Sequence, residues 1–142
     1  MEQRDFLTKQ IEQMGKVLAK LLADLLQLPI TDGLEESMAQ STRQLKELLD
    51  IDLDELISLN ADDLTKYLRQ SNFTTELMES LANYLQEIGN KQLNIKKESA
   101  FTSYRTALQL LHSADVISET FSYKREHMKS ELQTFIDPHS FF

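Results

Sequence analysis

The N-terminal segment of this chain carries one continuous apolar stripe. From Phe6 to Leu28, apolar residues recur at alternating spacings of four and three, which is the repeat of one face of an α-helix. The residues of this stripe are Leu7, Ile11, Met14, Leu18, Leu21, Leu25 and Leu28. A stripe of this length is larger than the exposed apolar patches that soluble monomers tolerate. We therefore expect a long amphipathic helix over 5–28 that packs against the rest of the chain, a second copy or a partner.

The rest of the chain also has helical periodicity, and its breakers mark where helices begin and end. Only three glycines and two prolines occur in 142 residues, and no segment alternates apolar and polar residues for long enough to form a strand. Capping residues predict four further helix starts, at Asp32 with Glu35, at Asn60, at Thr74 and at Ser122. Gly89-Asn90 predicts the end of one helix, and the next is expected to begin near Asn94.

These patterns predict an all-α fold. We expect a single helical domain over 1–142, built as compact antiparallel helical hairpins. Its parts are a long amphipathic N-terminal helix over 5–28, an acidic helical segment over 34–71 and a set of C-terminal helices over 73–136.

Two stretches carry a resemblance to known helical repeats. Ala100, Tyr104 and Ala107 have the small–aromatic–small spacing of the second helix of a tetratricopeptide repeat, and Tyr84 with Ile88-Gly89 resembles its first helix. The run from Tyr104 to Ser122 is also similar to an uncharacterised bacterial family of tetratricopeptide-like helical proteins, as is the run from Ile11 to Lys20. The resemblance implies a tetratricopeptide-like stack of helices. It implies no site residues, because that family has no established activity.

The net charge of −8 lies in one part of the chain. Residues 31–63 hold ten acids and two bases, whereas the acids and bases elsewhere cancel. Contacts to the backbone of nucleic acid need clustered lysines and arginines, and the nearest candidates, Lys91, Lys96 and Lys97, are sparse. The sequence therefore argues against a nucleic-acid partner.

Composition also predicts where the protein resides. The chain has no cysteine, which excludes disulfides and cysteine-based metal sites and fits a reducing compartment. The first residues mix acids with bases, and Lys16, Lys20 and Asp24 interrupt the apolar run, so we expect neither a secretory signal nor a membrane span. The resulting expectation is a cytoplasmic protein.

No group of residues has the spacing of a catalytic or metal site. The acidic run over 50–54 lacks the glycine and the glutamate of a calcium loop, and we interpret these acids as caps of a short helix. The histidines His112, His127 and His139 lie far apart, without a second ligand at zinc spacing. No serine lies in a Gly-x-Ser-x-Gly turn. We predict no catalytic residue, no metal and no cofactor, so the chain is not expected to be an enzyme.

The predicted function is a non-catalytic protein–protein interaction or scaffold module. The residues expected to mediate the contact are Leu7, Ile11, Met14, Leu18, Leu21, Leu25, Tyr84 and Tyr104. The partner is another protein or a second copy of the chain, which would form a homodimer across a two-fold axis. In such a contact the lysines beside the stripe, Lys9, Lys16 and Lys20, would meet Glu12 or Asp24 of the neighbouring helix.

Other interpretations stay open at this stage. The aromatic residues line either the core or a peptide groove, and their helical spacing favours the core. The tyrosines are the better groove candidates, because a buried phenol needs a polar partner. The alternative functions are binding of a peptide, a ligand or a membrane surface through the amphipathic first helix, and an enzyme is the third.

Overall fold

The structure, a computed structural model, describes residues 2–28 and 33–137, with side chains from Lys9 onward. Within these ranges the chain is all-helical and contains no strand, which confirms the predicted fold class. The helices are α1 (Glu2–Leu26), α2 (Leu34–Leu49), α3 (Leu53–Ser58), α4 (Ala61–Gln70), α5 (Thr75–Gln92), α6 (Lys97–Ser118) and α7 (Tyr123–Ile136).

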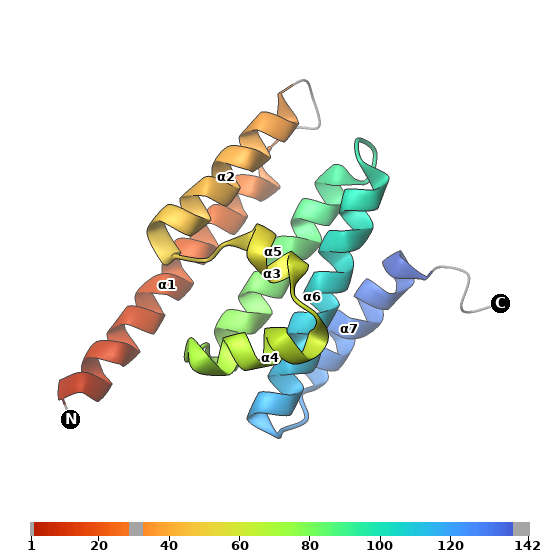
Figure 1. Ribbon diagram of the computed structural model, residues 1–142. Helices are drawn as coiled ribbons and strands as arrows, with labels where there is room; N and C mark the ends of the chain where they lie inside the picture. The colour runs from red at the N-terminus through yellow and green to blue at the C-terminus, as the bar shows by residue number, and fades with distance from the viewer. Residues whose placement is uncertain (1, 29–32, 138–142) are drawn as a thin grey trace.

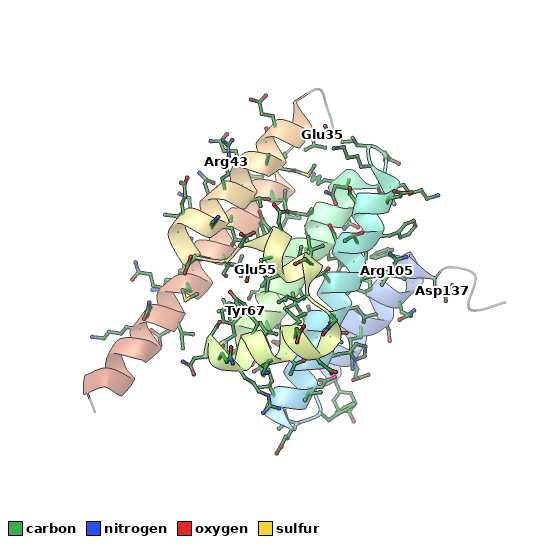
Figure 2. All side chains as sticks on the ribbon, viewed as in Figure 1. Glu35, Arg43, Glu55, Tyr67, Arg105 and Asp137 are labelled. Carbon is green, nitrogen blue, oxygen red and sulfur yellow. The ribbon has the colours of Figure 1, made fainter. Side chains whose placement is uncertain are left out.

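The antiparallel pair α5 and α6 lies at the centre of the fold (Figure 1). Helix α1 packs against α5 and pairs with α2, whereas α7 packs against the other side of the central pair, on α6. The short helices α3 and α4 lie against α6. One apolar core draws residues from all of these helices, so each covers part of its neighbours. Charged side chains such as Arg43 on α2 and Glu55 on α3 lie on the outside (Figure 2).

Local capping determines where several helices begin. The side chains of Asn60, Thr74 and Ser122 each accept a hydrogen bond from the backbone N–H three residues on, at 2.8, 3.1 and 3.2 Å. Each bond satisfies a donor that the first turn of a helix leaves without a partner. Asp52 caps α3 in the same way at 3.2 Å. The caps at Asn60, Thr74 and Ser122 were predicted from the sequence and are confirmed, and the acidic run over 50–54 caps a short helix through Asp52, as interpreted.

Helix α2 begins differently from the prediction. Asp32 lies outside the described residues, and the N-cap is Gly33, which provides no side-chain hydrogen bond. Gly33 has a φ of 90°, a left-handed conformation that glycine adopts without steric strain. Glu35 forms an ion pair with Lys96 at 3.5 Å, so it ties α2 to the loop before α6. The helix still spans Leu34–Leu49 as expected.

The predicted helix end at Gly89-Asn90 is wrong, because α5 continues to Gln92. Gly89 lies inside the helix, where a β-carbon would come within 2.6 Å of the Tyr104 ring on α6. The hydroxyl of Tyr104 donates a hydrogen bond of 2.7 Å to Asn90. The glycine therefore permits close contact between α5 and α6. Helix α6 also begins later than predicted, after Lys96 and not near Asn94.

Burial along α1 is uneven. Its fully buried side chains begin at Leu18, whereas Ile11 and Met14 are half-buried. The N-terminal turns project past the end of α2 (Figure 1). At the other end, the ammonium of Lys91 on α5 donates a hydrogen bond of 2.6 Å to the carbonyl of Leu28. The helix is therefore held firmly in its C-terminal half. It ends at Leu26 and not at residue 28.

Candidate functional site

Most of the residues predicted to mediate contacts lie in the core. Leu18, Leu21 and Leu25 of α1 are buried, as are Tyr84 of α5 and Tyr104 of α6. The half-buried pair Ile11 and Met14 lies on the same stripe, and the side chain of Leu7 lies outside the described residues. The chain's own helices cover the buried members of this set. A surface for a partner has to be built from the residues beside them.

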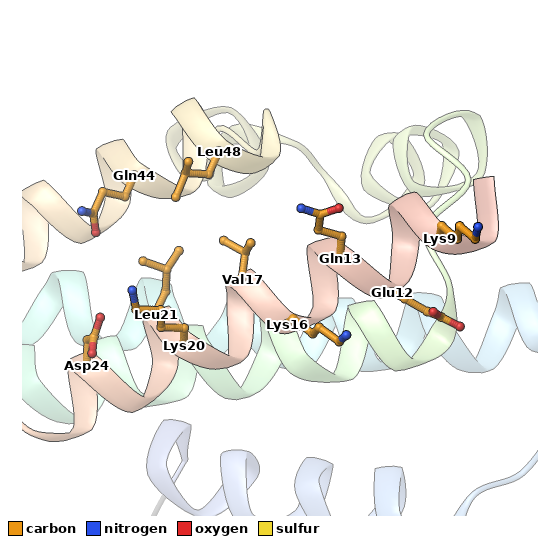
Figure 3. A pocket seen from close by; sticks show the side chains of 10 residues that line it. All are labelled: Lys9, Glu12, Gln13, Lys16, Val17, Lys20, Leu21, Asp24, Gln44 and Leu48. Carbon is orange, nitrogen blue, oxygen red and sulfur yellow. The ribbon is translucent and has the colours of Figure 1, made fainter. Parts of the chain in front are cut away.

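An exposed groove with apolar side chains lies between α1 and α2. A groove of about 650 Å³ lies between the two helices, and we call it the α1/α2 groove. Figure 3 shows Val17 and Leu21 pointing from α1 toward α2, while Gln44 and Leu48 point back from α2. Leu48 is 61% exposed, which is unusual for a leucine on a helix that contributes to the core. The groove therefore has an apolar centre that no other part of the described chain covers.

Charged side chains surround this apolar centre. Lys9, Lys16 and Lys20 line the groove together with Glu12 and Asp24, and all five are exposed. All five come from α1, because α2 contributes only the neutral Gln44 and Leu48. On a helix, positions 9, 16 and 20 lie in one row, since they are separated by about two turns and one turn. The groove therefore combines an apolar centre with a row of exposed lysines along one edge.

The two buried tyrosines have polar partners within the fold. The hydroxyls of Tyr84 and Ser41 share a hydrogen bond of 2.6 Å, which links α5 to α2. Burial raises the pKa of Tyr84, and hydrogen bonds with Ser41 and Thr42 offset part of that rise. Burial, and after it the charge of Glu87, raises the pKa of Tyr104. Both phenols therefore stay neutral at physiological pH and act as structural hydrogen-bonding groups.

A buried ionic cluster joins α5, α6 and α7, and the sequence patterns did not predict it. The guanidinium of Arg125 is centrally placed, and the residue is only 4% exposed. Its Nε donates to Asp115 at 2.7 Å, one Nη donates to the carbonyl of Thr120 at 2.9 Å, and the other lies 3.5 Å from Glu79. Lys129 also bonds Asp115, at 2.5 Å. No buried polar side-chain atom among the described residues is left without a partner.

This cluster shifts two pKa values. Burial opposes the charge of Asp115, but hydrogen bonds from Lys129 and Arg125 outweigh it and hold the pKa of the carboxyl below its usual value. Burial likewise opposes the charge of Lys129, but its bonds to Asp115 and Glu126 raise its pKa.

The sequence does contain one signal for this ionic cluster. Arg125 lies in the first turn of a helix, where the dipole disfavours a base, so a compensating acid is expected nearby.

The loop between α6 and α7 carries a second exposed apolar feature. Phe121 and Tyr123 are 67% and 84% exposed, and their rings pack edge to face with centroids 4.8 Å apart. Val116 on α6 is also exposed. The aromatic residues of the chain therefore divide, because Tyr84 and Tyr104 lie in the core while this pair lies on the surface.

The described residues include no group of three or more metal-ligating side chains placed to hold an ion. His112 and His127 are exposed on α6 and α7, and His139 lies outside the described part of the chain. The acidic run over 50–54 follows α2 and caps α3 through Asp52. The carboxylate of Asp52 also forms an ion pair with Lys46 at 3.6 Å.

No protein-family model, no curated protein and no solved structure matches this chain. Among the described residues, none of the helices combines the length and the apolar character required to cross a bilayer. The fold and the α1/α2 groove are consequently the features from which a function has to be argued.

Proposed function

We propose that this protein is a non-catalytic helical interaction module, and that a helix of a protein partner docks in the α1/α2 groove. The observation that carries the proposal is the exposed Leu48 at the centre of the groove, beside half-buried Val17. Two antiparallel helices form a channel along which a third helix can lie. Helix-in-groove recognition uses an apolar centre of this kind and charged residues at its edges.

The position of the perturbed titratable groups also supports a binding role. Catalytic sites gather side chains with shifted pKa values inside a cleft. Here the side chains with shifted pKa values include Tyr84, Tyr104, Asp115 and Lys129, and none of these four lines the α1/α2 groove. Each instead bonds a neighbouring helix or loop of the same chain. Self-association, a cytoplasmic location and a tetratricopeptide-like relationship stay predictions beside this proposal.

Site-specific photo-cross-linking in cells that naturally contain the protein tests the proposal. The cross-linker p-benzoylphenylalanine replaces Leu48 in one variant and Val116 in a control variant, which is 55% exposed on α6 and outside the groove. We expect a discrete protein adduct from position 48 and none from position 116, because only the former lies where the partner docks. Equal labelling from both positions, or no adduct from position 48, would contradict the proposal.

A further inference from the structure

The charges beside the α1/α2 groove indicate what kind of helix it accepts. Lys9, Lys16 and Lys20 form one exposed row along α1, which we call the lysine row. Successive members lie about 10 Å and about 6 Å apart along the helix axis, since each residue rises about 1.5 Å. No acid among the described side chains lies within ion-pair distance of the row. The three lysines therefore form no ion pair with any described side chain, and Glu12 and Asp24 lie one helical turn away from them.

The positive charge of the lysine row contrasts with the negative net charge of the whole chain. The whole chain has a net charge of −8, yet lysines outnumber acids along this groove. The two acids, Glu12 and Asp24, lie to either side of the row on the helix surface, so they do not interrupt it. Complementary charge across an interface selects partners and steers their approach.

We propose that an acidic amphipathic helix of a partner protein occupies the α1/α2 groove, an inference that rests on the proposed function. One face of this helix places an apolar side chain against Leu48 and Val17. Its adjoining face carries carboxylates at positions i, i+4 and i+11, which lie opposite Lys20, Lys16 and Lys9 when the helix runs antiparallel to α1.

The same geometry disfavours a second copy of this chain in the groove. A two-fold axis near Lys16 would bring this lysine against its own copy, and like charges brought together at an interface are costly. The acids beside the row offset this repulsion only in part, because the groove is lined by three lysines and two acids, Glu12 and Asp24. A helix with carboxylates in place of these lysines avoids the conflict.

Two synthetic helical peptides of about 20 residues test the inference by fluorescence anisotropy with the full chain. Both carry leucines along one face, and one has glutamates at i, i+4 and i+11 where the other has lysines. We expect the glutamate peptide to bind at least about tenfold more tightly. The double variant Lys16→Glu/Lys20→Glu should reverse this preference. The matched control Lys66→Glu/Arg69→Glu, which makes the same charge change on exposed residues of α4, should leave the preference intact.

Several outcomes would overturn this inference, and they differ in what they imply for the proposed function. Equal binding of the two peptides, or a preference that survives Lys16→Glu/Lys20→Glu, rejects the acidic helix but leaves a groove that binds helices. Binding of neither peptide rejects the acidic helix, and only a missing cross-link from position 48 would also reject the interaction module. A cross-linked product of twice the 16.4 kDa chain mass identifies a second copy as the occupant. Flotation with phosphatidylserine vesicles that depends on the lysine row identifies a lipid surface instead.

Discussion

Replacing Gly89 with alanine tests the packing between the two central helices. Alanine in a helix interior is usually favoured over glycine by about 1 kcal/mol. Here the added β-carbon would lie 2.6 Å from Cε1 and 2.8 Å from Cδ1 of the Tyr104 ring. That ring is fully buried, bonded to Asn90 and packed against Phe135 with ring centroids 5.1 Å apart, so it has little room to move away. Overpacking a rigid core site costs up to about 3 kcal/mol, so we expect Gly89→Ala to lower the free energy of unfolding by about 2 kcal/mol.

The assay is urea unfolding followed by circular dichroism, and the chain provides its own control. Gly15 lies inside α1, and no side chain or neighbouring helix lies within 4 Å of the methyl group that alanine would add there. Gly15→Ala should therefore raise the free energy of unfolding by about 0.5–1 kcal/mol. In a Tyr104→Leu background, the loss caused by Gly89→Ala should shrink, because the clashing ring is absent. If Gly89→Ala stabilises the protein as Gly15→Ala does, the proposed contact between Gly89 and the ring is wrong.

Four further predictions concern polar groups that join the helices. Arg125→Met removes one of the two cations that bond the partly buried carboxylate of Asp115, together with the ion pair to Glu79. It should lower the free energy of unfolding by about 2 kcal/mol, measured by urea titration. Because the pKa of Asp115 is lowered from its usual 3.8 in the folded state, the ionised carboxylate stabilises the fold at pH values above 3.8. This stabilisation should disappear as the pH falls below about 4. The Asp115→Asn variant should lack this pH-dependent loss. The raised pKa of Lys129 acts in the opposite direction, so thermal stability should also fall as the pH rises above 10.5 toward the folded-state value. Tyr84→Phe removes the hydrogen bond to partly buried Ser41 and should lower the free energy of unfolding, measured by urea titration, by about 1 kcal/mol.

Features that depend on neighbouring residues in the sequence were predictable. The caps at Asn60, Thr74 and Ser122 are formed with the backbone three residues away, so a short sequence window contains both partners. The helical class followed from the apolar spacing for the same reason. The interior of a helix is recognised from its own repeat, whatever it packs against.

Features that depend on distant residues were not predictable from these patterns. Gly89 has the sequence signature of a helix end, but its role is set by Tyr104 on another helix. The ionic cluster around Arg125 joins residues of three helices, and polar contacts of this kind leave no repeat in the sequence. Of the apolar stripe predicted along α1, the part from Leu18 to Leu25 is covered by the chain's own helices. Which of its residues stay accessible depends on α2, whose C-terminal turn brings Leu48 beside Val17.

The side chains of α1 that stabilise the fold are different residues from the charged side chains that surround the α1/α2 groove. The leucines that anchor this helix begin at Leu18, whereas the charged side chains beside the groove are all exposed and make no contribution to the core. Exchanging a surface lysine for another polar residue usually changes stability by less than about 0.5 kcal/mol. Single substitutions of these lysines would therefore change which partner the proposed docking groove selects, at little cost to the stability of the fold.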